Sequence, residues 1–142
     1  MAASALIDTG AILALVDRAD HWHMACVEAY TRSRLPLLTT EAVLTETFHL
    51  TERNRGDVQG VWRLLSSGAI RMSPIANEEL PHIQALMDDY SDRPMDFADG
   101  TLVHLAARES ISVVLTVDHD DFATYRLPRG KKFTILPTRS RT

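Results

Sequence analysis

The sequence SALIDTGAILALV, residues 4–16, contains the pattern that decides the fold class. Its first four residues form a short apolar run that stops at Asp8, and Thr9 and Gly10 separate this run from a helical pattern that continues to Val16. Such a pattern predicts a strand, a tight turn and a helix. An acidic residue therefore stands directly after the first predicted strand.

The rest of the chain repeats this alternation of strands and helices. Further helices are predicted over 21–32, 40–51, 57–65, 77–90 and 96–109, and further strands over 35–38, 69–72, 112–116 and 132–136. Thr39 or Thr40 is the expected cap of the helix that ends near residue 51. The alternation predicts an α/β sandwich with a central, mostly parallel sheet flanked by helices. No repeat or linker divides the sequence, so we expect a single domain over residues 1–142.

The composition is that of an ordinary globular protein, with 45% hydrophobic and 24% charged residues. Cys26 is the single cysteine, which excludes an internal disulfide and a multi-cysteine zinc site, and its helical apolar surroundings predict a packing role. The longest apolar run near the N-terminus, residues 11–16, is too short to span a bilayer. We expect a cytoplasmic protein that does not contact membranes.

The net charge of -4 argues against a strongly electropositive nucleic-acid binder. Basic residues nevertheless gather over 126–141, where Arg129, Lys131 and Lys132 are the candidates for holding a nucleic acid. The alternative for these residues is a solvated charged surface without a partner.

Two acidic residues follow predicted strands. Asp8 comes after the first strand and Asp118 after the strand over 112–116. In parallel α/β sheets the ligand sites lie beyond the carboxyl ends of the strands, so both side chains project into one crevice if the two strands are neighbours. The alternative is that each Asp only starts a turn or caps a helix.

A third acid, Asp99, lies on a predicted helix face that should be buried. On a period of 3.6 residues it shares that face with Leu102, Val103 and Ala106. A helix cap at Asp96 would place Asp99 in the first turn, where the helix dipole favours negative charge. That capping role explains Asp96 well, but it does not explain why Asp99 points inward.

Glu46 is expected to be a fourth inward acid, because it projects between Ala42 and the line of Val43 and Leu50. An unpaired buried charge costs several kcal/mol or is neutralised by a shift of its pKa. No lysine or arginine occupies a predicted inward position in these segments, so a divalent cation is the expected partner. Oxygen ligands suit Mg²⁺ or Mn²⁺, and the lack of a Cys/His cluster argues against zinc.

Four segments together resemble a known family. They are LIDTGA at 6–11, VLTE at 43–46, PMDFAD at 94–99, and LTVD at 115–118 followed by Asp121-Phe122. In this order and spacing they resemble the PIN domain, and most closely the toxin half of bacterial VapBC toxin–antitoxin pairs. Each segment alone is weak, whereas four in order, from residue 6 to residue 122, are a strong match.

The resemblance implies a Rossmann-like three-layer sandwich, RNA cleavage that depends on Mg²⁺ or Mn²⁺, a homodimer and a cognate antitoxin protein. Carried over by position, it implies a catalytic set with three metal-binding acids and several additional candidates. The catalytic set is Asp8, Glu46, Asp99 and Asp118, of which Asp8, Asp99 and Asp118 bind metal; the additional candidates are Asp96, Asp121, Thr9 and Thr116. Asp96 is an outer acid of the site or only a helix cap. Asp121 is a neighbour that orients the loop. The two threonines are candidate hydrogen-bond donors to a carboxylate or a phosphate.

Two alternatives remain for the function. The first is a PIN-like protein-binding module without catalysis, which the presence of all four acids disfavours. The second is a phosphoacceptor receiver domain, which needs paired acids after the first strand and an acceptor Asp after the third. Asp8 is single, and the segment after Met72 reads Ser73-Pro74-Ile75, so the receiver pattern is absent.

Overall fold

The computed structural model describes residues 5–139, so Ser4 of the first predicted strand lies outside the described residues. Its centre is a five-stranded sheet in which every pairing is parallel. The strands are β1 (Leu6–Ile7), β2 (Leu37–Thr39), β3 (Ile70–Met72), β4 (Val113–Leu115) and β5 (Thr134–Leu136), in the spatial order β3-β2-β1-β4-β5.

The strand order changes direction at β1. Leu6 pairs with Leu38 of β2 on one side and with Val114 of β4 on the other. The chain moves outward from β1 to β2 and β3, and then returns to the other side of β1 to form β4. In open parallel sheets this point of reversal is where a crevice forms beyond the carboxyl ends of the strands.

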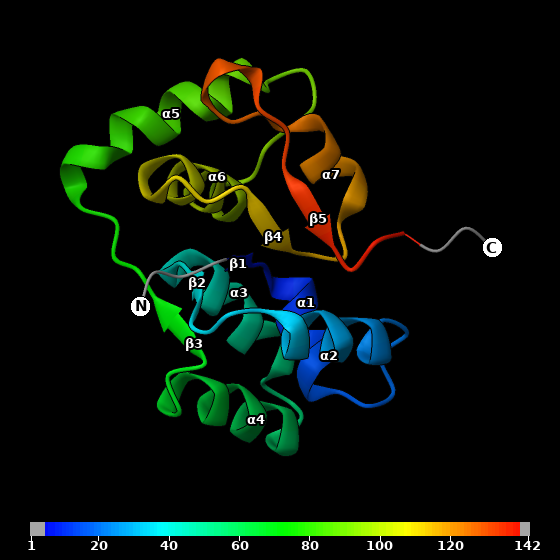
Figure 1. Ribbon diagram of the computed structural model, residues 1–142. Coiled ribbons are helices and arrows are strands. Elements are labelled where there is room, and N and C mark those ends of the chain that lie inside the picture. Colours follow the sequence, from blue (N-terminus) through cyan, green and yellow to red (C-terminus); the bar gives the residue numbers. More distant parts are fainter. Residues whose placement is uncertain (1–4, 140–142) are drawn as a thin grey trace.

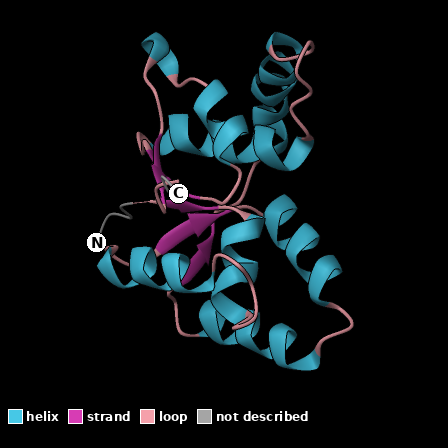
Figure 2. Cartoon of the chain, turned by 90° about the vertical axis from the view of Figure 1, so that its right-hand side faces the viewer, coloured by secondary structure: helices cyan, strands magenta, loops and turns pink. Residues whose placement is uncertain are grey.

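Helices connect the strands and cover both faces of the sheet. They are α1 (Thr9–Val16), α2 (His23–Arg32), α3 (Glu41–Thr51), α4 (Arg55–Ser66), α5 (Leu80–Asp89), α6 (Phe97–Glu109) and α7 (His119–Thr124), with short 3-10 turns at Asn77–Glu79 and Pro128–Gly130. Figures 1 and 2 show the strands between a helix group that includes α5 and α6 and another that includes α1 and α2. The predicted three-layer α/β sandwich is therefore confirmed.

Within residues 5–139 no helix combines the length and apolarity needed to cross a membrane.

Most element boundaries lie within two or three residues of the prediction. Thr40 caps α3 as expected, by accepting the N–H of Val43. The helix predicted from residue 21 begins at His23, because Asp20 accepts the N–H of Trp22 and holds a turn there. Helix α7 was not predicted at all. Six residues are fewer than two helical turns, too short to produce a recognisable apolar period.

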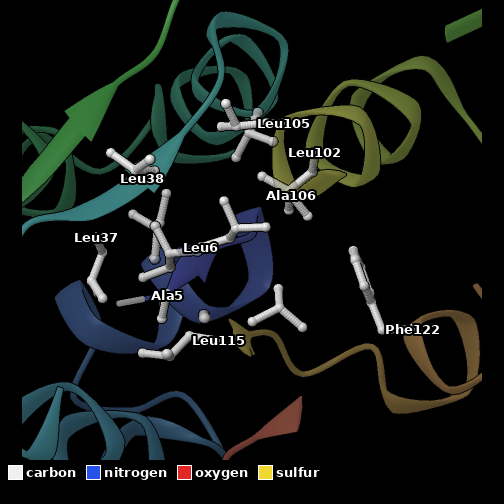
Figure 3. Close-up of a cluster of buried hydrophobic side chains, with 14 of the residues drawn as sticks. Ala5, Leu6, Leu37, Leu38, Leu102, Leu105, Ala106, Leu115 and Phe122 are labelled. Atoms are coloured by element: carbon white, nitrogen blue, oxygen red, sulfur yellow. The ribbon is translucent and has the colours of Figure 1, made fainter. Parts of the chain in front are cut away.

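The core forms where the strands meet α6. Leu6 and Ile7 are fully buried, as expected for a strand covered by helices on both faces. Figure 3 shows Leu6 in one cluster with Leu102 and Leu105 of α6. Cys26 is also fully buried, which confirms its packing role. The core thus fixes the positions of β1, β4 and α6, the three elements that carry the candidate acids Asp8, Asp118 and Asp99 on or just beyond them.

Candidate active site

Asp8 and Asp118 do lie at the same edge of the sheet. Strands β1 and β4 are direct neighbours, and the backbone N–H of Asp8 donates a 2.9 Å hydrogen bond to the carbonyl of Leu115. Asp118 follows β4 by three residues and begins α7. The condition for bringing these two acids into one crevice, that their strands pair, is therefore met.

Asp8 is a buried carboxylate that does not act as a helix cap. It is 8% exposed and stands at the start of α1, yet its side chain makes no capping hydrogen bond there. Instead, Oδ2 accepts a 3.1 Å hydrogen bond from the hydroxyl of Thr116, which is fully buried. Burial raises the pKa of Asp8 to about 6, against the opposing effect of this hydrogen bond, and the charges of Glu46 and Asp118 raise it further.

Gly10 lets the first helix pass close to the loop that carries Asp118. A Cβ atom at position 10 would overlap the side chain of Val117, the residue just before Asp118. A larger residue at position 10 would force the Val117 side chain or one of the two segments to shift. The glycine of the LIDTGA segment is thus required by a close approach between distant parts of the chain.

Asp99 lies in the first turn of α6, behind the cap that the sequence predicts. The carboxylate of Asp96 accepts the N–H of Asp99 at 2.8 Å and so caps the helix. Asp99 itself is partly buried, and its Oδ2 accepts a 2.7 Å hydrogen bond from the hydroxyl of Tyr125. Burial raises the pKa of Asp99 to about 8, and the charge of Asp8 contributes next. Asp8 and Asp99 therefore belong to one electrostatic site.

The expectation that Glu46 points inward is wrong, because its side chain is exposed. Helix α3 buries a different line of residues, which includes Val43 and Thr47, whereas Leu50 is 58% exposed. Glu46 still contributes to the site, since its charge helps to raise the pKa of Asp8. It therefore acts on Asp8 as an exposed neighbouring charge.

Asp118 and Asp121 lie together at the start of α7. Asp118 caps this helix by accepting the N–H of Asp121 at 3.3 Å. Burial raises the pKa of Asp118, with its neighbour Asp121 as the next cause. One arginine reaches this part of the cluster from outside those segments, because Arg93 forms a 3.1 Å ion pair with Asp121. Arg93 belongs to the loop between α5 and α6, outside the segments whose inward positions the sequence defines.

The two candidate threonines play different parts. The hydroxyl of Thr9 donates to the backbone carbonyl of Val43 at 3.3 Å, so it joins α1 to α3. The hydroxyl of Thr116 donates to Asp8 and also accepts the N–H of Asp118 at 3.0 Å. Thr116 thus links the two acids at the ends of β1 and β4.

The basic candidates lie between α7 and β5. Arg129, Lys131 and Lys132 are all exposed, and Arg129 adopts a left-handed backbone conformation beside Gly130. Arg126 is different, because its guanidinium donates to the carbonyls of Ala123, Thr124 and Tyr125 and so secures the end of α7. Arg141, at the end of the basic segment, lies outside the described residues.

Six acids therefore form one cluster, called here the acidic cluster: Asp8, Glu46, Asp96, Asp99, Asp118 and Asp121. Asp8 and Asp99, whose pKa values are raised most, are called here the inner acids. Their raised pKa values and the oxygen-only donor set of the cluster suit a hard divalent cation such as Mg²⁺ or Mn²⁺. As the side chains stand in residues 5–139, no three Asp, Glu, His or Cys groups are close enough to enclose an ion. The residues thus suit a divalent cation by their donor chemistry and their charge, and not by a preformed set of ligand positions.

A groove of about 840 Å³ opens beside Glu46 between the start of α3 and the start of α6. Its lining is largely apolar and includes Met72, Leu80 and Phe97, which are 45%, 40% and 49% exposed. Exposed apolar side chains gathered in this way are typical of a binding surface.

Sequence reasoning missed two residues of the site, Tyr125 and Arg93. Tyr125 stands three residues after Phe122, a spacing that would place both on one face of a helix, but α7 is too short to be predicted. Arg93 lies in a loop, where periodicity carries no signal. Both reach the acidic cluster only through the packing of distant segments.

Comparisons with known proteins agree with this fold and identify its family. A family model described as PIN domain matches residues 5–127. Ribonuclease VapC26 of Mycobacterium tuberculosis is 31% identical over 134 residues, which are 93% of this chain and 99% of that relative. The crystal structure of VapC20 from the same organism, described as a Sarcin-Ricin loop cleaving toxin, superposes with a TM-score of 0.69 at 18% identity, covering 78% of this chain and 87% of that one. At that identity the likeness to VapC20 concerns the fold.

Proposed function

The chain belongs to the PIN domain family, and on this premise we propose that it is a metal-dependent ribonuclease that hydrolyses RNA phosphodiester bonds at the acidic cluster. The observation that carries the proposal is the pair of inner acids, Asp8 and Asp99. Burial raises the pKa of both, and the charge of Asp8 raises that of Asp99 further. Such a pair is unfavourable unless a cation or a proton neutralises it.

Asp8, Asp99 and Asp118 are the residues that we propose hold Mg²⁺ or Mn²⁺, with Glu46 as the fourth catalytic acid. A bound divalent cation supplies Lewis acidity toward the phosphodiester and lowers the pKa of the attacking water. Asp8 and Asp99 provide the negative charge that attracts the cation, and the hydroxyl of Thr116 holds one oxygen of Asp8 in place. Glu46 and Asp118 are exposed, so they lie where a substrate would enter.

The chain also exposes positive charge that suits an RNA backbone. Arg93 is 46% exposed while it pairs with Asp121, so part of its guanidinium faces solvent beside the acids. Arg129, Lys131 and Lys132 are exposed on the segment that follows α7. We propose that these basic side chains offset the repulsion between RNA and a protein whose net charge is -4.

We further propose that the protein is the toxin of a toxin–antitoxin pair and forms a homodimer. The support is its 31% identity to Ribonuclease VapC26 over nearly the full length of both chains. The exposed apolar side chains of the groove beside Glu46 suit an antitoxin segment that would cover the entrance to the site. A small reading frame directly upstream, whose product co-purifies with this chain and stops cleavage, is the expected finding.

The ribonuclease proposal is tested by incubating purified protein with structured RNA in Mg²⁺, in Mn²⁺ and in excess chelator. We expect cleavage only with a metal, and no cleavage by folded Asp8→Asn or Asp99→Asn. Cleavage in chelator that persists in both variants would point to a contaminating nuclease. Metal-independent cleavage that the two variants abolish would contradict the metal mechanism.

A further inference from the structure

The hydroxyl of Tyr125 is held in place by the core, independently of the carboxylate that it contacts. Tyr125 is fully buried. Its ring packs edge-on against Phe122 and Tyr90, with ring centroids 5.2 Å apart in both pairs. Its backbone N–H donates to the carbonyl of Asp121 at 3.0 Å and closes the end of α7. The ring therefore presents its hydroxyl from a fixed direction.

The carboxylate of Asp99 is the less buried partner in this contact. Asp99 lies in the first turn of α6 and is only partly buried. The 2.7 Å hydrogen bond from Tyr125 occupies Oδ2, and no hydrogen bond among residues 5–139 reaches Oδ1. A carboxylate bound at one oxygen by a rigid donor loses rotational freedom, while its second oxygen stays available to a ligand.

We propose that Tyr125 is a positioning residue, which orients the free oxygen of Asp99 toward the acidic cluster by holding the other oxygen. The inference rests on the proposed function, because Asp99 must first be a metal ligand. The Tyr125 hydroxyl binds Asp99 of α6 in the same way that the Thr116 hydroxyl binds Asp8. Each inner acid is therefore bound at Oδ2 by a buried hydroxyl. Partners that orient metal ligands in this way typically change metal affinity about 10-fold to 100-fold when removed.

The test compares Tyr125→Phe with Tyr90→Phe. Phenylalanine keeps the packed ring at position 125 and removes only the hydroxyl that contacts Asp99. Tyr90→Phe is the matched control, because its hydroxyl accepts the N–H of Arg126 and lies beside the Tyr125 ring without contacting an acid of the cluster. Mn²⁺ binding is measured by calorimetry and by the loss of the electron paramagnetic resonance signal of free Mn²⁺. Thermal melting in chelator is the check on folding.

We expect Tyr125→Phe to lose about 10-fold or more in Mn²⁺ affinity, and Tyr90→Phe to stay within about twofold of wild type. Incorporation of p-aminophenylalanine at position 125, which restores an N–H donor, should recover most of the loss. Equal affinity of Tyr125→Phe and wild type, equal losses in both variants, or a Tyr125→Phe protein that does not fold would each overturn the inference. A wild-type protein that neither binds Mn²⁺ nor cleaves RNA would instead contradict the proposed function.

Discussion

The hydroxyl of Thr116 donates a 3.1 Å hydrogen bond to Oδ2 of Asp8, and so joins the carboxyl ends of two neighbouring strands. Both side chains are buried, and the same hydroxyl accepts the N–H of Asp118. One threonine thus holds an inner acid and an outer acid of the cluster. Because the bond favours the ionised form of Asp8, its strength depends on the charge of that carboxylate.

Thr116→Val should destabilise the protein, and more so at high pH than at low pH. Valine has the same shape but cannot donate, so the pKa of Asp8 rises above its value of about 6. The expected loss is about 1 to 3 kcal/mol near pH 8 and smaller near pH 5, where Asp8 is protonated in both proteins. Chemical denaturation in chelator at the two pH values measures the difference.

Thr47→Val is the control for this substitution. The hydroxyl of Thr47 is also fully buried, but it donates to the backbone carbonyl of Val43 at 2.8 Å and contacts no titratable group. Its cost should be the same at both pH values. If the stability loss of Thr116→Val is also the same at both pH values, the hydrogen bond to Asp8 does not stabilise its ionised form.

The metal-free protein should lose stability as pH rises from about 4 to about 8. The pKa of Asp8 is raised from 3.8 to about 6 and that of Asp99 to about 8, so the folded state holds both protons more tightly than the unfolded chain. The stability from these groups is fully present below about pH 4 and is lost as pH rises through their folded values. Glu79 affects stability in the opposite direction, because hydrogen bonds from Ala76, His104 and Arg108 lower its pKa to about 2. Its contribution to stability changes only below about pH 4.5, outside this range. Thermal melting across this range in chelator measures the slope.

Asp99→Asn should flatten the upper part of this dependence, because it removes the group with the higher pKa. Saturating Mg²⁺ should stabilise wild type at neutral pH by mass action, and Asp99→Asn by less. Asp96→Asn is the comparison that separates the two roles, since Asp96 caps α6 and contacts the N–H of Asp99. A substitution at position 99 that destabilises the chelated protein, combined with no effect of Mg²⁺ on wild type, would make Asp99 a structural residue only.

Glu46→Gln should lower cleavage at least about 10-fold while the free energy of unfolding stays within about 0.5 kcal/mol of wild type. The side chain is exposed, so the fold loses no packing, whereas the charge that acts on Asp8 disappears. Glu41→Gln is the control, because Glu41 is exposed on the same helix and lines the same groove. Equal rates for the two variants would remove Glu46 from the catalytic set.

Neutralising Arg129, Lys131 and Lys132 together should weaken RNA binding and flatten its dependence on salt. All three are exposed, so the triple glutamine variant should fold normally. The slope of log affinity against log salt should fall by about 0.7 to 0.9 for every phosphate that the variant no longer binds. Binding to uncleavable RNA in chelator, followed over a series of salt concentrations, gives this slope. An unchanged slope would show that these side chains are only solvated.

The sequence by itself determined the architecture and most of the acids. Alternating short apolar runs and amphipathic helices predict a parallel sheet, since each strand must be covered on both faces. Asp8 and Asp118 could be placed after strands whose carboxyl ends share one direction, but that these two strands are neighbours came from the structure. Asp99 could be placed on a buried face because Leu102 and Ala106 recur at the helical period. The strands, the helices and the buried face of Asp99 follow from local periodicity, which is a property of the sequence.

The tertiary structure alone decided which groups contact those acids. The inward direction predicted for Glu46 was wrong because α3 packs through Val43 and Thr47, and the helix rotation depends on its neighbours. Tyr125 and Thr116 reach Asp99 and Asp8 across 26 and 108 residues of sequence. Such contacts form only when the core fixes distant elements side by side, and no local period encodes them. The sequence therefore singled out the candidate acids, and packing decided how each carboxylate is held.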